Sequence, residues 1–305
     1  MNDHHEHRHH DHAHAHAPNA VMYAAVGITL GYAAVEAVAG LVAGSLALVS
    51  DAGHMVTDAV ALGIAAFAAW ISRRPASDRH SYGYVRAEII AAVVNSGFMI
   101  ALVATIALAA VSRMLSPHRV DGEMVTLVAG IGLGVNLAVG WLLSRGERDL
   151  NTRAALLHVM GDLLGSVAAL ASGLIVSYTG FTLIDPLLSF FICALILTSS
   201  LRLLRDGIHA LMEGVPDGFT LAEVGRDMAG VAGVVSVHDL HIWALSSNRT
   251  ALSAHVVVDK LGDWEVVLER ILAMLSGHHH IEHATLQPEV AGRRLYAIAE
   301  PAAHA

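Results

Sequence analysis

His54-Met-Val-Thr-Asp58 and His158-Val-Met-Gly-Asp162 are the two stretches that decide the fold of this chain, and each lies inside a long apolar segment. Residues four apart share one face of an α-helix, so each stretch presents an imidazole beside a carboxylate. Such groups are costly in lipid and normally face a protein interior or a water-filled cavity. If the two helices face each other, the two histidines and two aspartates form a four-ligand site of the kind that Zn²⁺ binds tetrahedrally.

The composition indicates an α-helical membrane protein with a small soluble domain. Of the 305 residues, 55% are apolar, and the mean hydropathy is +0.56. The apolar residues concentrate between Ala20 and Leu204, after which the sequence becomes mixed. No apolar h-region precedes Ala20, so we expect the first apolar segment, rather than a cleaved signal peptide, to direct the chain to the membrane.

Charge and cysteine content exclude several functions. The formal net charge is -9 without a long basic run, so nothing indicates a nucleic-acid partner. Cys193 is the single cysteine, which excludes a disulfide within the chain and a thiolate cluster. Any bound metal must therefore be held by histidine, aspartate and glutamate.

Six apolar segments are long enough to cross a bilayer, which needs about 20 helical residues. They are expected at Ala20–Val42, Leu46–Ile71, Tyr84–Val111, Glu123–Leu143, Arg153–Ser177 and Phe181–Leu204. Arginine gathers in the loops after the second and fourth segments and after the sixth, whereas the opposite side holds only Arg113 and Arg119. The positive-inside rule then places both termini in the cytoplasm.

The remaining third of the chain predicts a cytoplasmic α+β domain. Two segments have helical patterns and three are rich in β-branched residues. In chain order they are Thr220–Val231 (helix), Val234–Ala244 and Thr250–Asp259 (strands), Trp264–Leu275 (helix) and Ala284–Val290 (strand). This α-β-β-α-β order is ferredoxin-like. The expected division is a head at 1–19, a six-helix membrane domain at 20–206, a cytoplasmic domain at 207–292 and a tail at 293–305.

The four residues of the paired stretches are the strongest candidate metal ligands. A single buried histidine or aspartate is more often a helix-packing partner, but two matched pairs favour a metal site. Other polar residues share the membrane segments: Glu36, Asp51, Asn95 and Asn136. Asp51 lies one turn before His54, and for all four of these residues a structural, a water-facing and a ligating role stay open.

A His-Asp site also supplies a mechanism for transport. Metal ligands must lose their protons to bind, so metal entry releases protons and proton entry expels metal. Histidine does this near neutral pH. Helices that rock about such a site near the middle of the membrane would exchange metal for protons.

Several stretches resemble the cation diffusion facilitator family, and the resemblance covers nearly everything after the head. Ser45–Asp58 resembles its second membrane helix and Asp162–Ser166 its fifth, while Val237–Leu245 and Leu252–Val256 resemble its cytoplasmic domain. The resemblance implies a homodimeric metal exporter of the bacterial inner membrane that exchanges Zn²⁺ for H⁺. The His-Asp form of both pairs resembles the zinc-selective branch, with Co²⁺, Ni²⁺ or Cd²⁺ as secondary cargo.

The same resemblance implies a cytoplasmic metal site at His238, His255 and Glu289. Gln287 stands where some members have a further histidine ligand, so a second cytoplasmic metal would need His241 or His283 instead. The loop after the second helix also departs from the family pattern. This loop contains Asp78 and His80, but Tyr84 stands at the position where a second histidine is expected. We therefore do not expect an occupied site there.

Two histidine-rich segments remain. His4–His16 is low in complexity and is expected to be disordered, either capturing metal near the cytoplasmic entrance or having no effect on transport. His278–His280 is expected to be a solvated helix end, with transient metal binding as the alternative.

The two rival functions are an intramembrane zinc hydrolase and a membrane-anchored metal sensor. An intramembrane zinc hydrolase would keep a metal position open for water and a general base beside it; here the quartet fills all four positions, and no HExxH stretch occurs. A metal sensor anchored in the membrane would not need six spans. We therefore expect a transporter and not an enzyme, and metal movement in sealed vesicles separates these functions.

Overall fold

A computed structural model describes residues 20–144, 150–246 and 249–291, with side chains described for all of these except 20–26, 142–144 and 150–159. The expectations for the His-rich head and for the C-terminal tail lie outside these residues. The side chain of His158 also lies outside the described part of the chain.

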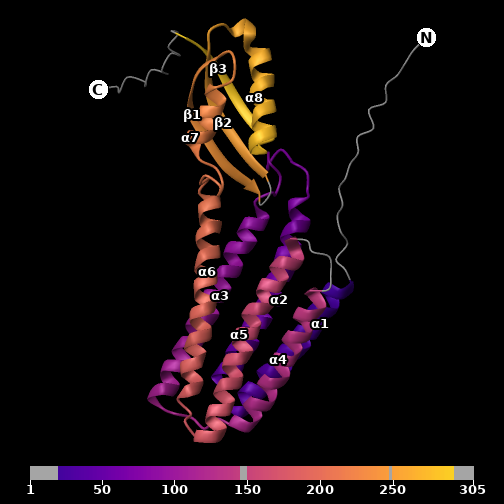
Figure 1. The fold of residues 1–305 in the computed structure, drawn as a ribbon, viewed down its shortest axis with the longest axis vertical. Coiled ribbons are helices and arrows are strands. Elements are labelled where there is room, and N and C mark those ends of the chain that lie inside the picture. Colours follow the sequence, from indigo (N-terminus) through magenta and orange to yellow (C-terminus); the bar gives the residue numbers. More distant parts are fainter. Residues whose placement is uncertain (1–19, 145–149, 247–248, 292–305) are drawn as a thin grey trace, which may run out of the picture. The chain divides into compact units, whose positions relative to one another are not determined.

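Six helices form the membrane region, as predicted (Figure 1). They are α1 (Ala20–Ala43), α2 (Leu46–Ser72), α3 (Ala87–Leu115), α4 (Gly122–Ser144), α5 (Leu150–Thr179) and α6 (Ile184–Leu211). Within the described residues, α2 to α6 are each long and apolar enough to cross a membrane, while the described apolar part of α1 is the shorter stretch Gly27–Ala43. Helix α6 continues past the expected end at Leu204, because no proline interrupts the chain until Pro216.

The described chain forms two compact units. The first comprises the chain up to Val60 and Ala101–Leu197, and the second comprises Ala61–Ile100 and the chain from Thr198 onward. In the first unit, α4 packs along both α1 and α5. Its core is built mainly from alanine, valine and leucine side chains of α1, α2, α4 and α5, together with Tyr32 and Met55. Close approach is possible because residues such as Ala33, Ala47 and Ala129, which are fully buried, have little bulk.

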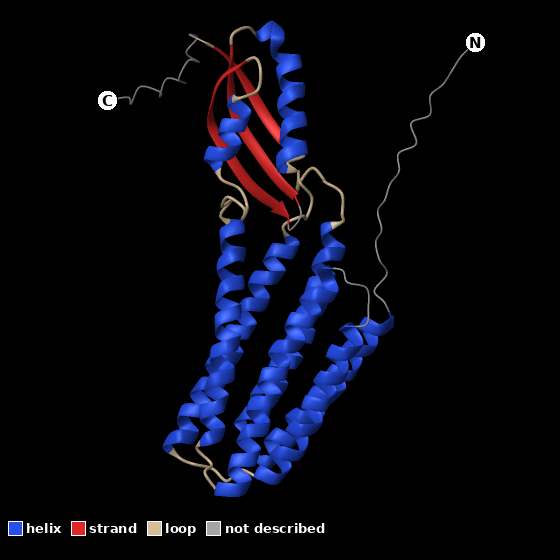
Figure 2. Ribbon diagram, viewed as in Figure 1, coloured by secondary structure: helices blue, strands red, loops and turns tan. Residues whose placement is uncertain are grey.

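The second unit contains the predicted cytoplasmic domain (Figure 2). After α7 (Leu221–Ala229) come β1 (Val234–Ser246) and β2 (Arg249–Val258), then α8 (Trp264–His279) and β3 (His283–Val290). The strands form one sheet in the order β1-β2-β3, in which β1 and β2 are antiparallel and β2 and β3 are parallel. The α-β-β-α-β prediction is therefore confirmed.

Both helices of this domain cover the same face of the sheet. Val224 and Met228 of α7 and Ile271 and Leu275 of α8 are buried in one cluster with alternate residues of β2, from Leu252 to Val258. Side chains alternate across a strand, so the intervening residues of β2, His255 among them, lie on the opposite face. The apolar face stabilises the domain, and the other face is left for polar chemistry.

Candidate metal sites

The intramembrane site is assembled from α2 and α5. His54 Nε2 lies 3.5 Å from Asp58 Oδ2 on the same helix and 3.8 Å from Asp162 Oδ1 on α5. Ligand atoms of the three residues all lie within 4.8 Å of one another. His158 belongs to α5 one turn before Asp162, so its backbone position shares that face of the helix.

These separations suit a small divalent cation. Ligands bound tetrahedrally at about 2.0–2.1 Å are roughly 3.3 Å apart, close to the spacing between His54 and each carboxylate. The side chain of Asp162 is only 4% exposed, and those of His54 and Asp58 are below 20%. One imidazole and two carboxylates in such a setting form a nitrogen–oxygen site that Zn²⁺ fits.

Asp51 is buried next to this site and contacts α5. Its carboxylate accepts a hydrogen bond of 3.4 Å from Ser166, whose oxygen accepts one of 3.0 Å from Asn136. A Cβ built on Gly165 would lie 2.3 Å from Asp51 Oδ1, so only glycine leaves room for this carboxylate. Two of the four additional polar residues thus meet in one network. Of the others, Glu36 of α1 is fully buried, and Asn95 of α3 belongs to the second unit.

Gly165→Ala should therefore impair transport. The added methyl group must displace Asp51 or separate α2 from α5, which changes the spacing of the ligands, and a misplacement of about 1 Å can reduce a rate about 100-fold. Gly161→Ala is the matched control, since no described atom lies within 4 Å of its Cβ position. Initial rates of zinc uptake by reconstituted protein test this; equal rates for the two variants would contradict it.

The predicted cytoplasmic residues also come together, one from each strand. Glu289 of β3 lies between the two histidines: its Oε1 is 2.6 Å from His255 Nδ1 of β2, and its Oε2 is 3.1 Å from His238 Nε2 of β1. The hydrogen bond from His255, with that from His238, lowers the pKa of the Glu289 carboxyl, although burial opposes this. The carboxylate thus stays ionised, the form that binds metal. Two imidazoles and a carboxylate fit Zn²⁺ with water as the fourth ligand.

Other candidate histidines have different neighbours. His80 packs its ring on Tyr84, with centroids 4.4 Å apart, and the ring of His283 meets that of Tyr82 edge-on. His279 differs from the expected solvated helix end, because its side chain is largely buried and its Nε2 lies 2.9 Å from Asp227 of α7. Packing between α7 and α8 places it there.

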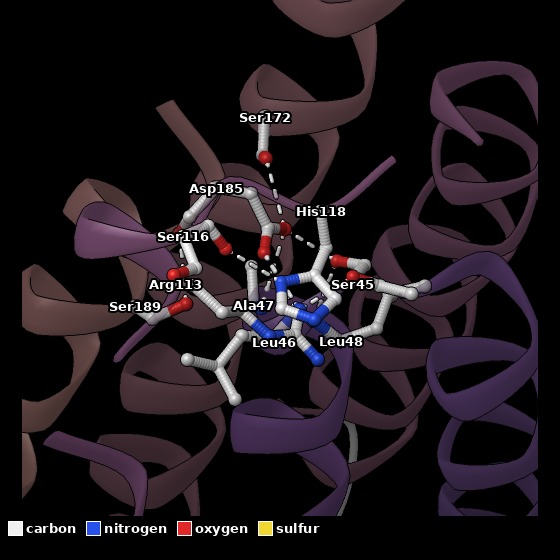
Figure 3. Close-up of polar contacts among 11 residues, drawn as sticks. Ser45, Leu46, Ala47, Leu48, Arg113, Ser116, His118, Ser172, Asp185 and Ser189 are labelled. Atoms are coloured by element: carbon white, nitrogen blue, oxygen red, sulfur yellow. Dashed lines mark hydrogen bonds and ion pairs between the residues drawn. The ribbon is translucent and has the colours of Figure 1, made fainter. Parts of the chain in front are cut away.

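A buried hub at Asp185 was missed from the sequence (Figure 3). Asp185 opens α6 and is fully buried, and its carboxylate accepts hydrogen bonds from the Ser45 hydroxyl (2.5 Å), the Leu46 amide (2.6 Å) and the Ser172 hydroxyl (3.2 Å). Arg113 of α3 lies 3.6 Å away. Asp185 thereby caps the first turn of α2, the helix that carries His54 and Asp58. An acidic residue followed by proline at a helix start was the only sequence signal.

Comparison with known proteins agrees with this architecture. The cation efflux transmembrane domain matches residues 22–212, and the cytoplasmic domain of cation efflux proteins matches residues 216–291. The chain belongs to the cation efflux family. The resemblance drawn from the sequence is thus confirmed.

Similar proteins in this family are bacterial. The zinc transporter ZitB of Escherichia coli is 42% identical over 87% of this chain and 85% of its own. The cadmium, cobalt and zinc/H⁺-K⁺ antiporter of Bacillus subtilis is 38% identical over 85% of each chain. CzcD of Cupriavidus metallidurans, a metal cation efflux system protein, is 39% identical over 88% of this chain and 85% of its own. Its metal-bound C-terminal domain, a solved structure, covers 23% of this chain and 99% of its own at 42% identity, with a TM-score of 0.22.

Proposed function

We propose that this protein is a secondary active exporter that removes Zn²⁺ from the cytoplasm in exchange for H⁺. The observation that carries the proposal is the convergence of His54, Asp58 and Asp162 from two apolar helices in a chain of the cation efflux family. His158, one turn from Asp162, is the fourth ligand. A site of this charge and burial in a membrane segment marks an ion pathway by default.

The exchange follows from the chemistry of the donors. Asp58 and Asp162 bind metal as carboxylates, and His54 and His158 bind it as neutral imidazoles. Protons arriving from the far side of the membrane compete for the same atoms, and they expel the metal there. When the helices return, the protons leave into the cytoplasm and restore the site. Because metal and protons cannot occupy these donors together, the two fluxes run in opposite directions.

Zinc is the preferred cargo. Mixed imidazole and carboxylate donors at tetrahedral spacing suit Zn²⁺ and also accept Co²⁺, Ni²⁺ and Cd²⁺. The activities for which relatives are named support this range: one is a zinc transporter, and another is an antiporter of cadmium, cobalt and zinc. On the resemblance to this family, the protein is a homodimer of the bacterial inner membrane with both termini in the cytoplasm.

The site at His238, His255 and Glu289 is proposed to hold a resident Zn²⁺. When bound, such an ion supplies a cross-link between the three strands of the sheet. The chain's own contribution is the position of Glu289, which lies within hydrogen-bonding distance of both histidines. Because this site belongs to the cytoplasmic domain, we expect it to adjust transport to the zinc supply and not to carry the cargo.

Metal uptake into proteoliposomes tests the proposed function. The purified protein is reconstituted with an acidic lumen, and Zn²⁺, Cd²⁺, Co²⁺, Ni²⁺ and Mn²⁺ are offered outside in turn. We expect gradient-dependent uptake that is fastest for Zn²⁺ and weakest for Mn²⁺, which prefers oxygen donors. Folded protein that binds zinc but moves none of the five metals would instead favour the membrane-anchored sensor.

A further inference from the structure

Asp239 lies between two histidines on the sheet face opposite the helices. Its Oδ1 is 3.1 Å from His241 Nε2, and its Oδ2 is 3.7 Å from His255 Nε2. The other ring nitrogen of His255, Nδ1, is the one beside Glu289. Each nitrogen of the His255 ring therefore faces a different carboxylate.

A β-bulge places Asp239 there. His238 pairs with His255 and His241 pairs with Ser253, so β1 has one residue more than β2 in this interval. Asp239 has a φ of 52°, in the left-handed region that aspartate and asparagine enter more readily than most residues. Bulges of this kind re-aim side chains and are frequent beside functional sites.

The bulge also changes which side chains share a face. In a regular strand, residues three apart point to opposite faces. Here Val237 and Leu240, which are three apart, both pack against the helix-covered core. By the same shift, His241 joins His238 on the other face, where it holds one oxygen of Asp239. The short motif His238-Asp239-Leu240-His241 thus collects three polar side chains on the metal-binding face.

We infer that Asp239 is a positioning residue for the cytoplasmic metal site, an inference that rests on the proposed site itself. A neutral imidazole that binds metal through Nδ1 carries its one ring proton on Nε2. Asp239 Oδ2 lies 3.7 Å from that nitrogen, so the carboxylate attracts the Nε2–H by charge and is placed to accept its hydrogen bond once the ring binds metal. This orients the ring of His255 and strengthens Nδ1 as a ligand. His241 donates to the second oxygen of Asp239 and keeps the carboxylate turned toward His255.

The geometry separates this role from direct ligation. Glu289 lies beside Nδ1 of His255, so a metal held by His238, His255 and Glu289 would bind this nitrogen, whereas Asp239 lies beside Nε2 of the same ring. Asp239 is also more than half exposed, while the Glu289 side chain is 15% exposed. Asp239 therefore contacts the His255 nitrogen that does not bind the metal, and it orients the ring without being a ligand.

The test is a zinc titration of the full-length protein in detergent against a chromogenic chelator. All samples carry Asp58→Ala and Asp162→Ala and lack residues 2–16, so that neither the intramembrane site nor the His-rich head contributes. Asp239→Gly keeps the backbone conformation and removes the carboxylate, and it should weaken zinc binding about 10–100-fold. Asp239→Asn keeps both the backbone conformation and an acceptor oxygen, so it should restore most of this loss.

Three results would overturn the inference. In the first, the zinc affinity of Asp239→Gly is within twofold of that of the same protein with Asp239 intact, while His238→Ala loses zinc binding. The proposed site then stands, but Asp239 has no role in it. Unchanged binding in His238→Ala as well would remove the proposed cytoplasmic site. Loss of a whole second equivalent of zinc in Asp239→Gly, with the first unaffected, would make Asp239 a ligand. Equal melting midpoints of metal-free Asp239→Gly and Asp239→Asn would show that backbone strain does not cause the weaker zinc binding of Asp239→Gly.

Discussion

Asp162→Asn should abolish zinc transport while the protein remains folded. Asparagine has nearly the same shape as aspartate but lacks the charge that a divalent cation needs. Mutation of a residue that hydrogen-bonds a metal ligand typically lowers metal affinity 10–100-fold. Loss of a ligand itself should therefore reduce uptake by more than about 100-fold. Asp162 is the most buried of the three described candidate ligands, so water cannot readily replace its oxygen.

Uptake at saturating and at low zinc measures this effect. Asp121→Asn serves as the control, because Asp121 is an exposed aspartate that accepts a hydrogen bond of 3.1 Å from the Met124 amide at the start of α4. It should transport like the wild type. Transport by Asp162→Asn at more than a tenth of the wild-type rate would show that Asp162 is a packing residue and not a ligand. Loss of the folded protein would likewise favour a structural role.

Among the proposed substitutions, Asp185→Asn should cause the largest decrease in the free energy of unfolding. The amide has one acceptor oxygen in place of two, and its NH₂ group would face the donors of Ser45, Leu46 and Arg113. Removing one partner of a fully buried ion pair costs about 3–5 kcal/mol. Arg113 retains some contact with solvent, so we expect about 3 kcal/mol, which corresponds to a decrease in melting midpoint of roughly 5 °C for a chain of 305 residues.

The single cysteine makes this measurable. Cys193 of α6 is 3% exposed, so a thiol-reactive fluorescent dye labels it only when the surrounding helices open during heating. Asp121→Asn keeps an acceptor oxygen at an exposed helix start, so it should change the free energy of unfolding by less than about 0.5 kcal/mol. Equal midpoints for the Asp185 and Asp121 variants would mean that the hub does not stabilise α2.

Much of the membrane region could be predicted because its signals are local. Apolar segments separated by glycine, proline and charged residues predicted six helices, and the spacing of His54 and Asp58 predicted one face of the site. What the local pattern did not contain is the approach of one helix to another. The space that Gly165 leaves for Asp51, and the four-helix contacts of Asp185, exist only after the chain has packed.

The cytoplasmic domain shows the same limit. The richness in β-branched residues predicted its strands, and the family resemblance supplied His238, His255 and Glu289. The bulge at Asp239 was not predictable from alternation, since it depends on the register between β1 and β2. That bulge moves His241 to the metal-binding face, so the number of polar groups around His255 became known only from the pairing of the strands.

The most direct test of metal–proton exchange is to record zinc entry and proton exit together. Proteoliposomes with an acidic lumen would contain both a zinc-sensitive and a pH-sensitive dye, and Zn²⁺ would be added outside. If metal and protons exchange at this site, zinc entry and luminal alkalinisation start together in the wild type, and both are absent in Asp162→Asn. Zinc entry without proton exit, or an exchange that Asp162→Asn leaves intact, would contradict metal–proton exchange at the site between α2 and α5.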